Sequence, residues 1–227
     1  MDNTALCYRQ FGEPESVLQQ ETAAKAPLQP GMLRVQMLLS PVNASDLIPI
    51  TGAYRHRITL PAIAGYEGVG RVIAAPDDAA SLLGQRVLPL RGEGTWQQIV
   101  DCPAALAIQV PDTIETPLAA RAFINPLAAW LMLNLYPVQG KRVLLTAAGS
   151  DCASLLGQWA QRRGATEVYG IHRSAVHADR LRAMGIVPIA QQESDTVRAV
   201  AAASDIVFDA TGGELALTLL SAMRSSG

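Results

Sequence analysis

The feature that most constrains the fold is the alternation of short apolar runs with longer helical segments after about residue 140. The apolar runs are RVLLTA (142–147), EVYGIH (167–172), IVPIA (186–190) and DIVFDA (205–210). Helical spacing is found near 152–163, 176–184 and 196–203, and again from about residue 213. Strands joined through helices run parallel, because each helix carries the chain back across one face of the sheet. This part of the chain therefore predicts a parallel α/β sheet of the nucleotide-binding type.

The first 111 residues follow a different pattern, in which Pro and Gly closely punctuate short apolar runs. Examples are GMLRVQMLLSPVN (31–43), GYEGVGRVIAAP (65–76) and ALAIQVP (105–111). Short strands at this spacing are typical of a small barrel or sandwich. We therefore expect a β-rich domain over residues 1–111 and an α/β domain over residues 112–227. The second domain should begin with a helix from about Pro117 to Tyr136, interrupted near Pro126.

Composition and charge exclude several classes of protein. Hydrophobic residues make up 49% of the chain and charged residues 17%, which is enough apolar material for a sizeable core. The net charge of −2 offers no long-range attraction for nucleic acid or anionic lipid. Polar residues and a proline break the most apolar stretch (117–138), so we expect no membrane span, and without an apolar leader we expect a cytoplasmic protein. The three cysteines lie too far apart to suggest a disulfide framework or a zinc knuckle.

Two glycine-containing segments could face a phosphate group. A phosphate-binding turn needs a strand before it and a helix N-terminus after it, because the helix supplies unpaired N–H groups. The segment AGYEGVG (64–70) is followed by the β-type run RVIAAP, so we interpret it as a turn between strands with Glu67 as a structural carboxylate. In TAAGSDCAS (146–154), Gly149 and Ser150 lie between a strand and a helix, and we expect them to bind the cofactor.

The end of the second strand of the predicted sheet bears on the choice of cofactor. A carboxylate there would bind the adenosine ribose and favour NAD. This chain instead has His172, Arg173 and Ser174 and no acid. A guanidinium with a neighbouring hydroxyl suits a 2′-phosphate, which favours NADP(H). The alternative is an ordinary solvated arginine.

Several segments in this order are similar to one known group of enzymes. The segments are SPVNASDLIPITGAY (40–54), LPAIAGYEGVGRV (60–72), GTWQQIVDCPAALAIQVPD (94–112), INPLAAW (124–130) and DIVFDATGG (205–213). Together they resemble the medium-chain dehydrogenase/reductase superfamily, in particular its zinc-independent 2-enoyl thioester reductases and related quinone reductases. The resemblance implies a GroES-like catalytic domain followed by a Rossmann cofactor domain, with Thr211 and Gly212 also in the cofactor site.

The same resemblance bears on metal binding and catalysis. Asn43 and Tyr66 stand where zinc-dependent relatives have Cys and His, and neither is a usual zinc ligand, so no zinc is expected. Tyr54 stands where the enoyl reductases have their catalytic tyrosine, whose phenol can donate to a developing enolate. Asn43 is a second catalytic candidate, which could bind the substrate or a ribose hydroxyl. Trp96 could form a wall of the substrate cleft or pack within the barrel.

These observations predict an NADPH-dependent reductase that transfers hydride to a small molecule with an activated double bond, either an enoyl thioester or a quinone. Two departures from the family pattern, Asp151 in the cofactor turn and Ala128 in place of a hydroxyl, leave a second hypothesis. In that hypothesis the chain is a cofactor-impaired or non-catalytic binding protein. Only four strand-like runs are present, so we expect an incomplete Rossmann sheet in the order 3-2-1-4, with DIVFDA at its edge. The homodimer interface of the family should then be missing.

Overall fold

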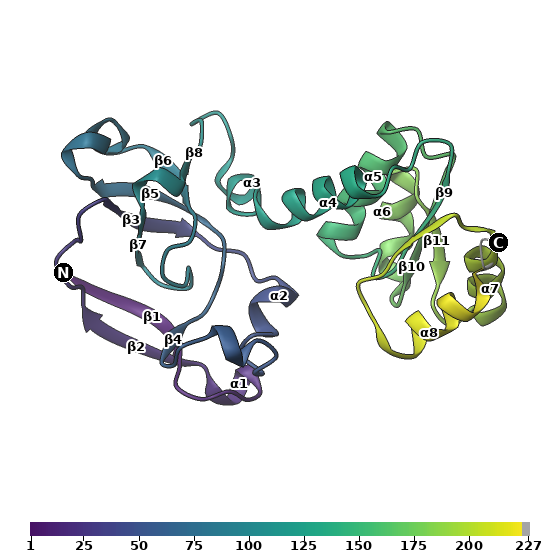
Figure 1. Cartoon of the computed structure of the whole chain (residues 1–227), viewed down its shortest axis with the longest axis horizontal. Coiled ribbons are helices and arrows are strands. Elements are labelled where there is room, and N and C mark those ends of the chain that lie inside the picture. Colours follow the sequence, from purple (N-terminus) through teal and green to yellow (C-terminus); the bar gives the residue numbers. More distant parts are fainter. Residues whose placement is uncertain (224–227) are drawn as a thin grey trace. The chain divides into compact units, whose positions relative to one another are not determined.

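The computed structural model describes residues 1–223, and the chain divides into two compact units that meet between Phe123 and Ile124 (Figure 1). The expected boundary at residue 111 was set where the sequence pattern becomes helical. In the structure, helix α3 (Thr116–Ala120) still belongs to the first unit. Its Ala119 and Ala120 are buried against Val69, Leu88 and Val110 of the β-rich part. The burial of this short helix therefore moves the boundary to a later residue.

The first unit contains two antiparallel sheets. One has the order β2-β1-β4, and the other has the order β7-β3-β5-β6-β8. The strands are β1 (Asp2–Tyr8), β2 (Gln19–Ala24), β3 (Met32–Leu39), β4 (Ala62–Ile63), β5 (Val69–Ala74), β6 (Arg86–Pro89), β7 (Ile99–Pro103) and β8 (Ala107–Gln109). Between them lie the short helices α1 (Pro14–Val17) and α2 (Ala44–Leu47) and the 3-10 segments η1 (Arg55–Arg57), η2 (Asp77–Leu82) and η3 (Ala104–Leu106). The expected β-rich domain is confirmed.

The core of the larger sheet follows from alternation along its strands. Leu33 and Val35 are two residues apart on β3, so both point to the same face, and both are fully buried. They pack with Val72, Val87 and Val100 from the neighbouring strands. This apolar face gives the GroES-like unit a core of its own.

The second unit contains one parallel sheet with the order β11-β10-β9-β12. Its strands are β9 (Arg142–Leu145), β10 (Glu167–His172), β11 (Val187–Ala190) and β12 (Ile206–Phe208), and all neighbouring pairs are parallel. In chain order this is the predicted 3-2-1-4 arrangement of a Rossmann sheet. The helices are α4 (Ile124–Leu135), α5 (Asp151–Arg162), α6 (Ala178–Ala183), α7 (Ser194–Ala203) and α8 (Gly213–Ala222), with the 3-10 segment η4 (Ala175–His177).

Both faces of this sheet are covered, which explains why its strands read as continuous apolar runs. On β9, Val143 and Leu145 belong to a cluster with residues of α4 and α5. Leu144, between them, belongs to a second cluster with Val197 of α7 and Leu219 of α8. Successive residues of one strand thus supply two separate cores.

One helix prediction is corrected by the structure. The helical stretch is interrupted at residues 121–123, between α3 and α4, and not at Pro126. Pro126 is the third residue of α4. A proline is tolerated there, because the first N–H groups of a helix have no partner within the helix. Pro126 therefore sits in the first turn of α4 instead of breaking it.

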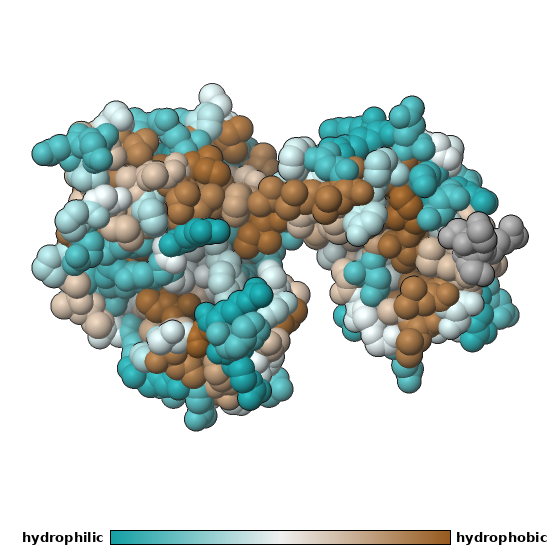
Figure 2. Space-filling model, viewed as in Figure 1, coloured by the Kyte–Doolittle hydropathy of each residue, from teal (hydrophilic) through white to brown (hydrophobic). Residues whose placement is uncertain are grey.

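Helix α4 has an unusually apolar exposed side. Figure 2 shows apolar residues gathered along this helix, and its partly exposed members are Leu127, Trp130, Leu131 and Leu135. Its buried side is formed by Ala129 and Leu133. Among residues 1–223, no helix is both long and apolar enough to cross a membrane.

Within the described residues, β12 is hydrogen-bonded to β9 and to no other strand. The predicted place of DIVFDA at the edge of the sheet therefore agrees with the structure. The expected loss of the family's homodimer interface stays a prediction.

Candidate functional site

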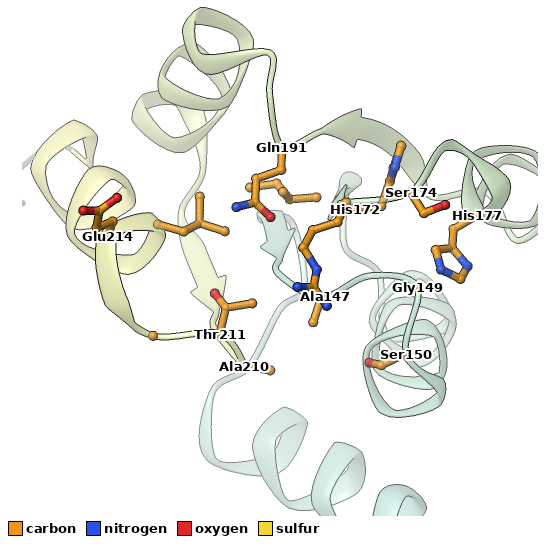
Figure 3. A pocket seen from close by; sticks show the side chains of 14 residues that line it. Ala147, Gly149, Ser150, His172, Ser174, His177, Gln191, Ala210, Thr211 and Glu214 are labelled. Atoms are coloured by element: carbon orange, nitrogen blue, oxygen red, sulfur yellow. The ribbon is translucent and has the colours of Figure 1, made fainter. Parts of the chain in front are cut away.

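A cavity of about 830 Å³ lies where the strands of the parallel sheet end (Figure 3). The residues predicted to bind the cofactor all line it, and they come from three separate segments of the chain. They are Gly149, Ser150, Arg173, Ser174, Thr211 and Gly212. The carboxyl ends of parallel strands meet at one edge of a sheet, which is where open α/β folds bind ligands. The structure thus brings these residues together in one pocket, and their role in cofactor binding is taken up below.

The turn between β9 and α5 has the geometry of an anion-binding turn. Ser150 is the N-cap of α5, and its hydroxyl accepts a hydrogen bond of 3.2 Å from the backbone N–H of Ala153. This bond satisfies one of the donors that the start of a helix leaves without a partner inside the helix. Ala147 in the same turn has φ of +46°, a left-handed conformation that is uncommon for residues other than glycine. Such strain is often found at binding sites.

Asp151, the acidic departure in this turn, has its own partner. Its Oδ1 lies 3.1 Å from a guanidinium nitrogen of Arg180, the third residue of α6. Asp151 does not line the cavity. As the first residue of α5, its carboxylate also interacts favourably with the helix dipole. Its charge is therefore balanced by an arginine from the neighbouring helix.

The ionisable side chains that line the cavity are one arginine, two histidines and one glutamate. Arg173 is exposed, and within residues 1–223 its guanidinium makes no hydrogen bond or ion pair. His172 is only 6% exposed, and its Nδ1 has no hydrogen-bond partner in the described part of the chain. The other charged or ionisable side chains in the lining are His177 and Glu214. This lining suits an anionic ligand.

Sequence reasoning missed Asp209, which organises the loop after β12. Its Oδ1 accepts hydrogen bonds from the hydroxyls of Thr146 (2.6 Å) and Thr211 (2.7 Å) and from the Thr211 N–H (3.1 Å). Its Oδ2 accepts from the Gly212 N–H at 2.8 Å. Burial acts to raise the pKa of Asp209, but these hydrogen bonds together hold the pKa below its ordinary value. The signal that could have found it is an Asp directly after a strand in the sequence Asp-Ala-Thr-Gly-Gly, because an Asp side chain readily accepts from the backbone N–H two residues on in an Asx-turn.

In the first unit, the segment AGYEGVG joins β4 to β5, and no helix follows it. The interpretation of this segment as a turn is confirmed. Glu67 is 2% exposed, and its Oε1 accepts a hydrogen bond of 2.8 Å from the side-chain amide of Asn43. Within residues 1–223, no three His, Cys, Asp or Glu side chains are grouped to hold a metal ion.

The buried Asp46 connects α2 to this turn. Its Oδ2 accepts from the N–H of Asn43 (2.7 Å), and its Oδ1 accepts from the N–H of Tyr66 (3.0 Å). Burial raises the pKa of Asp46, and the N–H donors oppose this effect without cancelling it. Burial and the nearby Asp46 carboxylate also raise the pKa of Tyr66. Asp46 therefore holds Asn43 and Tyr66 in place through their backbones.

Tyr54 and Trp96 differ in how they are held. Tyr54 precedes η1, and 47% of it is exposed. Trp96 is half-buried, and its Nε1 donates to the carbonyl oxygen of Pro41 at 3.0 Å. Its ring lies so close to Gly65 that a Cβ there would come within 2.3 Å of the ring atom Cδ1. These contacts favour the packing alternative for Trp96, and its role as a cleft wall stays a prediction.

Comparison with known proteins places this geometry in a family. Residues 29–112 match the alcohol dehydrogenase GroES-like domain. The mitochondrial enoyl-[acyl-carrier-protein] reductase of Homo sapiens is 31% identical over 198 residues, which cover 83% of this chain and 52% of the human protein. The enzyme of the same name from Caenorhabditis elegans is 38% identical over 135 residues, covering 58% of this chain and 39% of the relative.

Solved structures give the same result. A putative NADPH:quinone reductase from Bacillus thuringiensis is 36% identical with a TM-score of 0.91, covering 100% of this chain and 71% of that one. A mycobacterial protein complexed with NADPH is 25% identical with a TM-score of 0.86, covering 99% of this chain and 72% of that one. The chain therefore belongs to the zinc-independent medium-chain dehydrogenase/reductase superfamily. It spans about half the length of the curated relatives it matches.

Proposed function

We propose that the protein is an NADPH-dependent reductase that acts on a small molecule with an activated double bond. The observation that carries this proposal is the cavity at the carboxyl end of the parallel sheet. It combines the N-terminus of α5 with the guanidinium of Arg173, which makes no hydrogen bond or ion pair within residues 1–223, and the second strand ends in His172 without a carboxylate. This combination favours a dinucleotide that carries a 2′-phosphate.

The residues of the cavity fit such a cofactor. The N–H groups at the start of α5, beside Gly149 and Ser150, suit a pyrophosphate. Arg173 and Ser174 offer a guanidinium and a hydroxyl to the 2′-phosphate. Thr211 and Gly212, held by Asp209, form the opposite wall. When bound, the reduced nicotinamide supplies a hydride.

Tyr54 is the proposed proton or hydrogen-bond donor to the substrate. A carbonyl oxygen gains negative charge when the conjugated double bond is reduced, and a donor aimed at that oxygen stabilises the charge. A phenol keeps its proton at neutral pH and can serve as this donor. The partial exposure of Tyr54 supports the proposal, because the side chain can be reached by a ligand. Asn43, oriented by Glu67, is proposed to bind the substrate or a ribose hydroxyl.

The substrate class is proposed from the names of relatives, which include enoyl-[acyl-carrier-protein] reductases and a putative NADPH:quinone reductase. We accordingly propose an enoyl thioester or a quinone as the acceptor. We also propose that no zinc takes part, because Asn43 and Tyr66 stand at the positions of the metal ligands in zinc-dependent relatives.

The proposal is tested by binding first and turnover second. NADPH and NADH are titrated against the 227-residue chain while nicotinamide fluorescence is followed, and NADPH is expected to bind more tightly. Oxidation of NADPH is then measured with a short enoyl-CoA and with a simple quinone. Failure to bind either nucleotide would refute the reductase assignment. Binding of NADPH without turnover of either acceptor would favour the non-catalytic alternative.

A further inference from the structure

We propose that His177 is a further residue that contacts the 2′-phosphate of the cofactor, so that Arg173 and His177, both in the segment HRSAVH (172–177), determine nucleotide preference. This inference rests on the proposed function. It adds a specificity residue that the strand-end pattern does not reveal, because His177 lies beyond the end of β10, in η4.

The position of the His177 ring is set by its contact with Gly149. A Cβ added to Gly149 would lie 2.5 Å from Cδ2 of His177, 2.7 Å from its Cγ and 2.8 Å from its Nε2. The ring is therefore packed directly against the glycine of the β9–α5 turn. Its opposite edge, which carries Nδ1, is turned away from the glycine. Figure 3 shows His177 near Gly149 and Ser174, at the other end of the cavity from Glu214.

The charges around His177 favour an anionic partner. Two acidic side chains, one on the following helix α6 and one at the start of α5, are each paired with an arginine. The Oδ1 of Asp179 lies 2.7 Å from a guanidinium nitrogen of Arg182. The Oδ1 of Asp151 lies 3.1 Å from a guanidinium nitrogen of Arg180. The same cavity lining adds the guanidinium of Arg173, and it includes the Nδ1 of His172, which has no hydrogen-bond partner in the described residues.

An imidazole in this place can supply a directed donor. Neutral histidine donates one N–H, and protonated histidine donates two. Arg173 is exposed and has no hydrogen-bond or ion-pair partner within residues 1–223, whereas the His177 ring is half-buried and packed against Gly149. A held donor loses less conformational entropy on binding than a mobile one. His177 is therefore expected to add to the affinity for a phosphate that Arg173 also contacts.

The test uses the substitution His177→Phe, which keeps an aromatic ring against Gly149 and removes the N–H groups. Adenosine 2′,5′-bisphosphate and AMP are titrated calorimetrically into the full chain and the variant. We expect the variant to bind the bisphosphate about tenfold more weakly, as for a hydrogen bond to a charged group, and to bind AMP as before. His177→Gln, which retains an N–H donor, should recover part of the loss. His177→Leu should repeat the loss if the Phe variant folds poorly.

Two results would overturn the inference. Unchanged affinity of His177→Phe for the bisphosphate would mean that the ring does not contact the 2′-phosphate. Equal losses for the bisphosphate and AMP would mean that His177 only supports the turn. Both results can be interpreted in this way only when the unaltered chain binds adenosine 2′,5′-bisphosphate more tightly than AMP. If it shows no such preference, the proposed NADPH specificity fails and the inference fails with it.

Discussion

Replacing Arg173 with alanine is the most direct test of NADPH specificity. The side chain is exposed and makes no hydrogen bond or ion pair within residues 1–223, so its removal breaks no polar contact of the described chain. The free energy of unfolding should therefore change by less than about 0.5 kcal/mol. A hydrogen bond to a charged group contributes about 1.5 to 3 kcal/mol, and an exposed guanidinium should lie near the lower figure because solvent screens it. The affinity for NADPH should then fall roughly tenfold.

The assay is a fluorescence titration of NADPH and NADH at two salt concentrations. NADH lacks the 2′-phosphate, so its affinity should not change in Arg173→Ala. Arg162→Ala is the matched control, because Arg162 is an exposed arginine in the last turn of α5 and does not line the cavity. Added salt should reduce the difference in NADPH affinity between the unaltered chain and Arg173→Ala, since ions screen an exposed charge. Equal losses for both nucleotides would refute the role assigned to Arg173.

Three further predictions concern catalysis, metal binding and stability. Tyr54→Phe should lower turnover by roughly 10²-fold without weakening NADPH binding, and an unchanged rate would refute the catalytic role proposed for Tyr54. Elemental analysis of dialysed protein should find no stoichiometric zinc, whereas bound zinc that resists a chelator would contradict the proposal that no zinc takes part. Asp209→Asn should lower the free energy of unfolding at pH 7 by less than about 1 kcal/mol, since it puts an amide NH2 where the Gly212 N–H now meets a carboxylate oxygen, and solvent screens this exposed carboxylate. Because folding lowers the pKa of Asp209, its contribution is present above its unfolded pKa and is lost as pH falls through the folded value. Chemical denaturation should therefore show that the difference in the free energy of unfolding between the unaltered chain and Asp209→Asn shrinks below about pH 4. A difference that does not change with pH would exclude this explanation.

The parallel sheet could be predicted from the sequence because its signals are local. Strand β10 has the bounds predicted from the run EVYGIH, and α5 begins within one residue of the expected start. Periodicity and turn chemistry depend on residues close together in the chain, and these determine which segments can form strands or helices. The same local reasoning placed Gly149, Ser150, Arg173 and Ser174 at the cavity, because a turn after a parallel strand always lies at the same edge of the sheet.

Tertiary structure alone decided which side chains meet across long separations in sequence. The domain boundary moved past α3 because Ala119 and Ala120 are buried against the β-rich unit. The Thr146 hydroxyl donates to Asp209 although 63 residues separate them. Nothing in the sequence near Gly149 indicates that the His177 ring lies against it. Such contacts depend on how the helices pack on the sheet, and local pattern does not encode that packing. The sequence by itself therefore determined the strands and the polar turns, and folding determined which of their side chains act together.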